Sequence, residues 1–389
     1  MPDPQTDPFS SRYPSYAALR RGRPVRRIPR AEGPDTWIVT GYAEACQAFT
    51  DPRISKDAAR FYADWPVNRD LHPALVKHLL NSDPPEHTRL RKLVARAFTS
   101  KAVSRLRPHI QQITDGLVAS WSPGEPVDAV EQLTAPLPVA LICDMFGVPE
   151  ADRASIRRWT SDLFATGDTS RIDTASHTIA DYMTQLITDK RCGPDDSLLS
   201  DLITARDQED HLTEAELVSL AVLLFMGKVE PTTSGLNGAL LTLLQEPHAV
   251  ERLREDPDRI SSLIDELLRY DTPVSIASFR CTTAPVLLGE TEVPKDALIY
   301  ISPGGANRDP ARFPKPDSFA PDRDATGHLA FGHGRHRCFG APLVHAETEI
   351  VLRTLFSRFP NLRLAVPPAE LHWRQFRMIR SLVELPILV

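Results

Sequence analysis

Glycine and cysteine are scarce in this sequence of 389 residues. It contains 18 Gly against 35 Pro, so glycine lies below its usual share of ~7% and proline lies well above ~5%. Its cysteines contain no Cys-x-x-Cys pair and are Cys46, Cys143, Cys192, Cys281 and Cys338. An odd and scattered set argues against a disulfide framework and indicates a reducing compartment.

Signals for export and for membrane insertion are also missing. The first eight residues are acidic and proline-rich without an apolar core, so they do not read as a signal peptide. The longest apolar stretch, residues 217–226, is far shorter than the ~20 residues that cross a bilayer. The net charge of −6 argues against a general nucleic-acid-binding surface. We therefore expect a cytoplasmic protein that binds neither membranes nor nucleic acid.

The pattern along the chain predicts a mainly α protein with small β-sheets. Apolar residues make up 42% of the sequence, which is enough for a large core. Apolar spacings of three and four predict helices through residues 84–270, including 214–245 and 256–270. Short strands are expected at 36–40, after 274 and at 382–389, and helices at 43–49 and after 340. We expect one domain over residues 1–389, with a β-rich part at about 30–75, a helical body at about 84–270 and a β-rich, loop-containing part at about 271–389.

The segment around Cys338 is the most unusual part of the chain. Three glycines in ten residues predict a backbone that needs open conformations or approaches a bulky partner closely. Cys338 follows Arg335, His336 and Arg337 and precedes a helix, so its thiol pKa is expected to be lowered. A buried free cysteine is the simplest interpretation. A zinc site from His333, His336 and Cys338 lacks a second ligand pair, and the third option is thiolate ligation of heme iron.

This segment resembles the cysteine loop of the cytochrome P450 family, Phe-x-x-Gly-x-x-x-Cys-x-Gly. Four further motifs occur in the family's order: residues 83–91 (Asp-Pro-Pro-x-His-Thr-Arg-x-Arg), 266–269 (Glu-x-x-Arg), 306–309 (Ala-Asn-Arg-Asp) and 319–323 (Phe-x-Pro-x-Arg). The resemblance extends over essentially the whole chain. It implies a single P450-type fold, with a long distal helix above a heme b and the cysteine loop below it.

The resemblance also implies roles for individual residues. Cys338 would be the iron ligand, and its thiolate donates the electron density that favours O–O cleavage. Glu266, Arg269 and Arg323 would form a buried ion network that supports the loop. Residues implied to bind the cofactor, including partners for its two propionates, are His87, Arg91, Arg280, Phe331, His336, Cys338 and Gly340. Phe331 is expected to pack on the heme and sulfur side.

The distal helix departs from the family pattern. The family has Ala-Gly-x-Asp/Glu-Thr-Thr, whose acid and alcohol relay protons during oxygen activation, whereas this chain has Gly227-Lys-Val-Glu-Pro-Thr-Thr233. Aligning the glycines leaves neither group in place, so we favour the register that makes Glu230 the acid and Thr232, followed by Thr233, the nearby alcohol. Pro231 should kink the helix. Glu230 could equally pair elsewhere and never reach the heme, and Lys228 is expected to form a salt bridge with a helix below.

The substrate and the electron donor are less well defined. Candidate pocket residues, each of which could equally be core packing, are Phe61, Trp65, Met226, Gly227, Ile276 and Phe376. A basic face, which could dock an acidic ferredoxin or be an ordinary solvated surface, is expected from Arg89, Lys92, Arg96, Arg335 and Arg337. Since no flavin or ferredoxin domain is visible, a ferredoxin and its reductase are expected in trans, and the protein is expected to be a monomer.

The expected activity is monooxygenation of an apolar or aromatic secondary metabolite with dioxygen and electrons from NAD(P)H. The altered distal helix leaves a second activity open, namely oxidative coupling or ring closure of an aromatic, Trp- or Tyr-containing small peptide. A heme-binding sensor without turnover is the alternative from another class.

Overall fold

The computed structural model describes residues 23–29, 33–57, 69–166, 168–209, 212–374, 376 and 378–389. Most of the described chain is helical. The longer helices are α2 (Tyr42–Thr50), α5 (Glu86–Ala95), α6 (Ser100–Leu117), α7 (Pro136–Phe146), α8 (Arg153–Phe164), α9 (Thr169–Cys192), α10 (Leu198–Glu209), α11 (Glu214–Leu244), α12 (Pro247–Glu255), α13 (Ile260–Tyr270) and α15 (Ala341–Arg358). Short helical turns are α4 (Pro73–Val76), α14 (Pro303–Ala306), the π turn η3 (Val130–Thr134) and the 3₁₀ turns η1 (Leu79–Asn81), η2 (Arg96–Phe98), η4 (Glu150–Asp152), η5 (Pro257–Arg259), η6 (Gly334–His336) and η7 (Pro368–Glu370).

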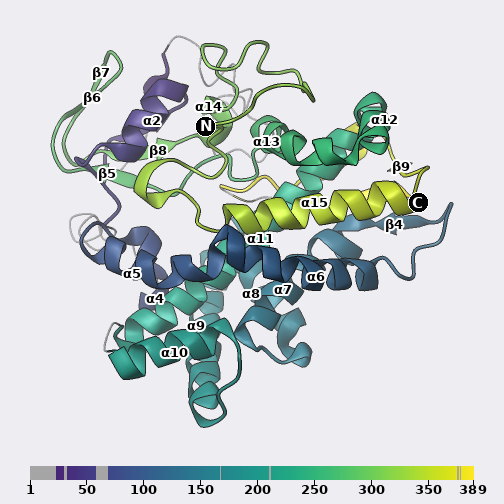
Figure 1. The fold of residues 1–389 in the computed structure, drawn as a ribbon. Coiled ribbons are helices and arrows are strands. Elements are labelled where there is room, and N and C mark those ends of the chain that lie inside the picture. The colour runs from purple at the N-terminus through teal and green to yellow at the C-terminus, as the bar shows by residue number, and fades with distance from the viewer. Residues whose placement is uncertain are drawn as a thin grey trace.

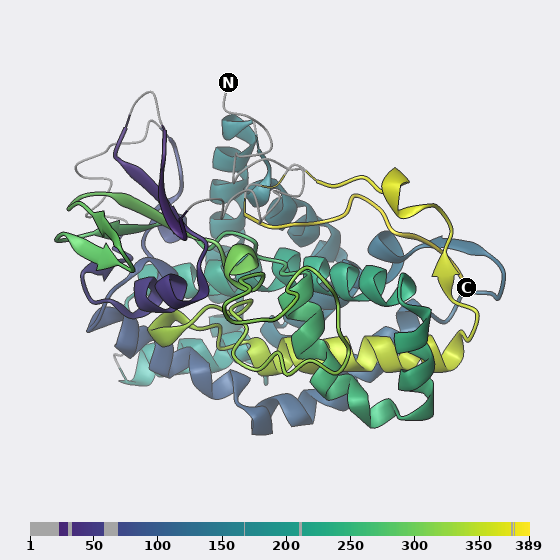
Figure 2. The same cartoon turned by 90° about the horizontal axis from the view of Figure 1, so that it is seen from above.

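The strands form small sheets that join distant parts of the chain. A five-stranded sheet has the order β1 (Val25–Ile28), β2 (Thr36–Val39), β8 (Leu298–Ile301), β5 (Arg280–Thr282) and β3 (Ile54–Ser55), with only β2 and β8 parallel. The others are β4 (Pro126–Asp128), β10 (Pro386–Leu388) and β9 (Arg363–Leu364) in one sheet and β6 (Val286–Leu288) and β7 (Thr291–Val293) in another. Figure 2 shows the N-terminal strands and those of residues 280–301 together at one side of the helical body.

Helix α11 runs through the middle of the protein and is buried on nearly all sides (Figure 1). It begins with a capping box, because the Thr213 hydroxyl accepts from the Glu216 N–H (3.2 Å) and the Glu216 carboxylate accepts from the Thr213 N–H (2.8 Å). Among the described residues it is the one helix long and apolar enough to cross a membrane. However, 83% of its most apolar window is buried inside the protein, as a core helix would be.

The predicted fold class is confirmed, and most predicted elements are present. Strand 36–40 is β2, the helix at 43–49 is α2, and the helix at 214–245 is α11. The helix expected from residue 256 begins as a 3₁₀ turn and becomes α-helical only at Ile260. The expected strand at 382–389 is ordered as a strand only at Pro386–Leu388. Asp83 does not cap α5, because its carboxylate accepts from the Ser55 hydroxyl (2.5 Å) and the Lys56 N–H (3.2 Å) instead.

Candidate active site

Two glycines shape the loop that precedes Cys338. Gly332 and Gly334 both have φ of 69°, a conformation that disfavours any residue with a Cβ. A Cβ on Gly334 would also lie 2.8 Å from Thr50 Cγ2 and 3.2 Å from the Phe49 carbonyl oxygen. The turn closes when the Cys338 N–H donates to the Phe331 carbonyl at 2.8 Å. These open conformations, predicted from the glycine cluster, present Cys338 just before the first turn of α15.

The Cys338 thiol lies among groups that favour its ionised form. The Gly340 N–H donates to the sulfur, and the cations Arg91, Arg337 and Lys228 lie within electrostatic reach. Protein atoms nevertheless crowd the sulfur although some of its surface is exposed, and this desolvation outweighs those groups and raises the thiol pKa. The predicted lowering of the pKa is therefore wrong for the metal-free site. Coordination to a metal ion would remove the proton outright.

Phe331 packs between the cysteine loop and two helices. Its ring centroid is 5.6 Å from that of His328 and 5.7 Å from that of His345 on α15. It packs against a small buried cluster that includes Ile264 and Leu268 of α13. Phe331 therefore packs the cysteine loop against α13 and α15, and its contact with the heme stays a prediction.

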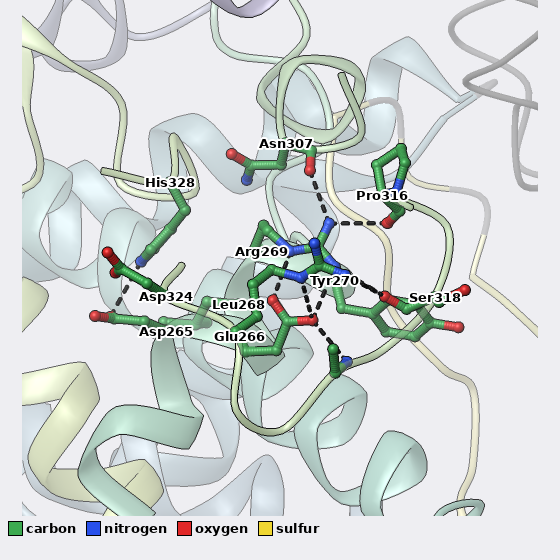
Figure 3. Close-up of polar contacts among 12 residues, drawn as sticks. Asp265, Glu266, Leu268, Arg269, Tyr270, Asn307, Pro316, Ser318, Asp324 and His328 are labelled. Carbon is green, nitrogen blue, oxygen red and sulfur yellow. Dashed lines mark hydrogen bonds and ion pairs between the residues drawn. The ribbon is translucent and has the colours of Figure 1, made fainter. Parts of the chain in front are cut away.

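The structure joins Glu266, Arg269 and Arg323 in one buried network (Figure 3). Arg269 donates to both Glu266 oxygens at 2.6 and 2.9 Å, and Arg323 Nε donates to Glu266 Oε1 at 3.2 Å. The side chains of Glu266 and Arg269 are 0% exposed. Arg269 also donates to the carbonyls of Asn307 (2.9 Å), Pro316 (2.9 Å) and Ser318 (3.3 Å). This network ties α13 to residues 307–323, the segment that leads into the cysteine loop.

A second group of buried polar side chains has almost no partners. The rings of His87 and His336 lie 4.1 Å apart between centroids, and both nitrogens of His87 and Nε2 of His336 have no hydrogen-bond partner among the described residues. Arg280, 4% exposed, donates to the Ser278 carbonyl at 3.0 Å, and burial lowers its pKa to about 10. Arg91 is held to the loop by a 2.5 Å bond to the Arg337 carbonyl. These donors are arranged to receive an anion.

Lys56 and His78 belong to the same region and were not predicted. Lys56 is 1% exposed and donates to the Ser278 hydroxyl at 2.6 Å and the Phe279 carbonyl at 3.2 Å. Burial, with Lys56 and other cations nearby, lowers the pKa of His78 to about 3 and of His336 to about 2. Lys56, Arg280 and His336 line a cavity of about 150 Å³. Single-sequence reasoning offers no signal for Lys56, because its burial arises only where β3 meets β5.

The distal helix is open at one point. Gly227 is exposed in the middle of the buried helix α11, and a Cβ there would meet nothing within 4 Å. Pro231 lies on the same face, since four residues turn an α-helix by about 40° beyond a full turn. It has no N–H, so the Gly227 carbonyl lacks its helical donor. The helix nevertheless continues without interruption from Glu214 to Leu244.

The predicted distal acid and alcohols lie in different directions. Glu230 hydrogen-bonds to Ser161 of α8 and lies near Arg374 and Arg157; desolvation still raises its pKa. Thr232 and Thr233 are buried, and each is turned more than about 100° around the helix from Gly227. The Thr233 hydroxyl has no partner among the described residues. The open face thus carries a proline where the favoured register requires the first alcohol.

Lys228 forms the salt bridge that was expected of it. Its ammonium pairs with Glu347 of α15, and the two side chains are 8% and 0% exposed. Burial lowers the pKa of Lys228 and raises that of Glu347. The pair ties the distal helix to the helix that begins after Cys338.

Comparison with known proteins agrees with this geometry. Residues 53–381 match the model of the family described as Cytochrome P450. The chain belongs to the cytochrome P450 family. It is 40% identical over 383 residues to Cytochrome P450 107B1 of Saccharopolyspora erythraea, covering 97% of this chain and 94% of that protein. The tirandamycin C-bound P450 monooxygenase TamI superposes with a TM-score of 0.90 at 39% identity and covers 99% of this chain and 98% of TamI.

A second solved structure with the same TM-score is described by a different reaction. The cytochrome P450 enzyme CxnD, for C–S bond formation in chuangxinmycin biosynthesis, has a TM-score of 0.90 at 34% identity and covers 98% of this chain and 95% of CxnD. The chain is thus a P450 oxidoreductase of the monooxygenase class that depends on heme iron. The described residues fit that cofactor: Cys338 offers a sulfur ligand. His87 and His336 offer ring nitrogens without a described partner, and Arg280 offers a buried cation with one described hydrogen bond and no described ion pair, which suits two carboxylates.

The predicted pocket residues of this P450 separate into three groups. Met226 is half-buried and Gly227 is exposed, so both border open space. Ile276 is 1% exposed and packs with Ile38, Leu298 and other residues in a hydrophobic cluster, so it belongs to the core rather than to a pocket wall. Phe376 is largely buried, 6.3 Å from Phe164 between ring centroids. Phe61 and Trp65 lie outside the described residues.

The predicted basic face is present but smaller than expected. Lys92, Arg96, Arg335 and Arg337 are exposed. Arg89 is also exposed, but it forms an ion pair with Glu216 at the start of α11. The Arg91 bond to the Arg337 carbonyl places this face beside the cysteine loop.

Proposed function

We propose that this P450 holds heme b and inserts one oxygen atom from dioxygen into an apolar or aromatic secondary metabolite. The electrons would come from NAD(P)H through a ferredoxin reductase and a ferredoxin, in the cytoplasm, to a monomeric single-domain enzyme. The observation that supports this most lies beside the cysteine loop, where the ring nitrogens of His87 and His336 lack described partners and the buried Arg280 lacks a described ion pair. Bound there, the heme would supply the oxygen-activating chemistry, assisted by electron donation from the thiolate.

Several residues would serve that reaction directly. His87, Arg280 and His336 would orient the cofactor by binding its two carboxylates, with Arg91 beside them. The open surface at Gly227 would leave room above the iron, and Met226 and Phe376 would shape the apolar end of the pocket. Glu230 would hold a proton near the open face of α11, because burial raises its pKa. Thr232 and Thr233 would contribute less, since they are turned away from Gly227.

The ligand assignment is tested by Cys338→Ala in the purified holoenzyme. The reduced, carbonyl-bound wild type should show a thiolate-type Soret band, and the variant should lose it. Cys46→Ala is the matched control, because Cys46 is half-buried in α2 and should leave the band unchanged. A thiolate-type band in the Cys338 variant would refute the assignment.

The reaction itself is tested with labelled dioxygen. Spin-state titration against natural-product precursors identifies a binding substrate, which is then turned over with a surrogate ferredoxin system. We expect the product to contain one labelled oxygen atom. We also expect Glu230→Gln to slow turnover without changing the substrate-induced spin shift, whereas Glu131→Gln, which alters another carboxylate beside Arg157, should leave both unchanged.

Oxidative coupling or ring closure of an aromatic substrate is the second candidate. It is favoured by Pro231, which leaves the open face of α11 without an alcohol, and by the similarity to CxnD, which forms a C–S bond. Coupling removes hydrogen from the substrate without transferring oxygen to it. A product without label would therefore favour coupling, and a Soret shift without turnover of any binding ligand would favour a heme sensor.

A further inference from the structure

Three side chains outside the heme site meet beneath the cysteine loop. They are Asp265 of α13, His328 in the segment before the loop, and His345 of α15. Asp265 Oδ1 lies 3.2 Å from His328 Nε2 and 3.2 Å from His345 Nε2, and all three atoms lie within 4.8 Å of one another. Figure 3 shows the Asp265–His328 contact just beyond Glu266.

The two Asp265–histidine spacings match those of a metal site. With bonds of about 2.0–2.2 Å, tetrahedral Zn²⁺ places neighbouring ligand atoms roughly 3.3 Å apart. Two imidazoles and one carboxylate suit Zn²⁺, whereas Mg²⁺ and Ca²⁺ prefer oxygen ligands alone. We propose that Asp265, His328 and His345 bind one Zn²⁺ ion, with water in the fourth position.

The burial and charge of the three groups favour a cation. Their side chains are 32%, 6% and 33% exposed, so the cluster is sheltered but has a path to solvent. Desolvation acts to raise the pKa of Asp265, but hydrogen bonds with His328 and His345 outweigh it and hold the pKa well below its usual range. Figure 3 also shows Asp324 beside Asp265, a second negative charge near the ion.

Binding has a defined cost at His328. Its Nδ1 accepts from the Ala330 N–H at 3.2 Å, so Nε2 carries the proton in the metal-free ring. Zinc on Nε2 requires that single ring proton to move to Nδ1, which removes the Ala330 bond at a cost of about 1 kcal/mol. Because zinc binds imidazole only in its neutral form, zinc affinity should fall at low pH, where protons compete for the two rings.

The site lies where it can act on the cysteine loop. The Phe331 ring contacts both histidines, 5.6 and 5.7 Å from their ring centroids, and the Phe331 carbonyl accepts from the Cys338 N–H. An ion bound by residues of α13 and α15 and by residue 328 would hold in place the side chains against which Phe331 packs. The consequence is a structural zinc site that stabilises the loop from the side opposite the substrate.

The test uses untagged holoenzyme that has been stripped of metal with a chelator and dialysed. Zinc is titrated by calorimetry and by competition with a chelating dye, and metal content is measured after gel filtration. We expect one equivalent of bound Zn²⁺, no response to Mg²⁺ and a zinc-dependent rise in Tm. His345→Gln should lower the affinity by at least about 100-fold, since loss of even an outer-shell partner costs 10–100-fold.

Controls locate the site and keep the test decisive. His248→Gln is the matched control, because His248 is 95% exposed beside Glu251 and should not change the affinity. Asp265→Asn should weaken zinc binding as His345→Gln does; if it disturbs Glu266 and heme binding, His345→Gln alone decides the matter. An absence of saturable zinc binding would overturn the proposal and leave a proton-sharing triad, and equal affinities for wild type and His345→Gln would also overturn it.

Discussion

Arg269 and Arg280 are both buried arginines, but their surroundings differ completely. Arg269 donates to both oxygens of Glu266 and to three backbone carbonyls. Arg280 has one described hydrogen bond, to Ser278, and no ion pair with a described carboxylate. Its neighbours include Lys56 and His336 rather than acids, apart from Asp83.

The difference separates two kinds of buried charge. A charge whose partners are all in the chain stabilises the folded protein before any ligand binds. A buried charge without partners is unfavourable in the free protein and becomes favourable only when a ligand supplies the opposite charge. The Arg269 network is therefore structural, while the region around Arg280 is a binding site, and each can be tested by removing one charge.

The largest effect is expected from Glu266→Gln. The change leaves both Arg269 and Arg323 without their carboxylate, and breaking a buried ion pair costs about 3–5 kcal/mol. The variant should be produced with little heme and should unfold at much lower urea concentration, in the free and heme-bound forms alike. Asp322→Asn, which removes an exposed ion-pair partner of Arg252, should change the urea midpoint very little, because solvent screens an exposed pair. Equal stability of the two variants would contradict the comparison.

Lys228→Met should have the next largest effect. It leaves Glu347 buried, with Oε1 already lacking a described partner. Because burial raises the pKa of Glu347, the carboxyl can take up a proton, so the loss should be about 2–3 kcal/mol, below the full range for a broken buried pair. The double variant Lys228→Met with Glu347→Leu should regain most of the urea stability. If the double variant is as unstable as the single one, the Lys228–Glu347 pair must stabilise the fold by more than cancelling two buried charges.

Secondary-structure elements and motifs could be predicted from the sequence more reliably than the burial and pKa values of the site residues. The apolar spacing was sufficient to predict helix α11, and the spacing of Glu266 and Arg269 was sufficient to predict an ion pair on one helix face. Lys56 was missed because its burial depends on strands more than 200 residues apart in sequence. The predicted direction of the Cys338 pKa shift was wrong. Neighbouring charges can be read from the sequence, whereas the desolvation that outweighs them cannot. For Ile276 the sequence left both a pocket wall and the core open, because an apolar residue suits each equally, and the structure buries it in an apolar cluster.

Arg280→Met should give opposite results in the two forms of the protein. Without heme, replacing a buried charge that has no described ion-pair partner with an apolar chain of similar length should be neutral or stabilising by about 1 kcal/mol. With heme, the lost charged hydrogen bond should cost about 1.5–3 kcal/mol, or roughly 10–100-fold in heme affinity. Urea unfolding measures the stability of the heme-free and heme-bound forms, and heme transfer to an acceptor protein measures the heme affinity. If the heme-free variant is less stable than the heme-free wild type, Arg280 is a structural charge like Arg269, which would contradict the comparison.

His78→Gln tests the same region through its pH dependence. The folded pKa of His78 is about 3, below the unfolded value of 6.5, because burial and the nearby Lys56 disfavour the charged ring. The unfolded chain therefore binds one more proton between these values, and stability falls as pH drops below 6.5 by up to about 1.4 kcal/mol per pH unit. The variant should lose stability less steeply over pH 6–4 in urea unfolding. Parallel curves for variant and wild type would show that His78 is not the group responsible.

The smallest effect is expected at the surface, from Lys92→Ala. Lys92 is an exposed cation on α5, beside the Arg91 contact with the cysteine loop. Rim charges contribute about 0.5–1 kcal/mol to docking, so the KM for an acidic ferredoxin should rise roughly 2–5-fold. High salt should erase the difference, and the substrate-induced spin shift should not change. Arg363→Ala is the matched control, because Arg363 is exposed on β9 near the opposite end of α15 (Figure 1). An equal change in KM for both variants would show that net charge, rather than the face beside Cys338, governs docking.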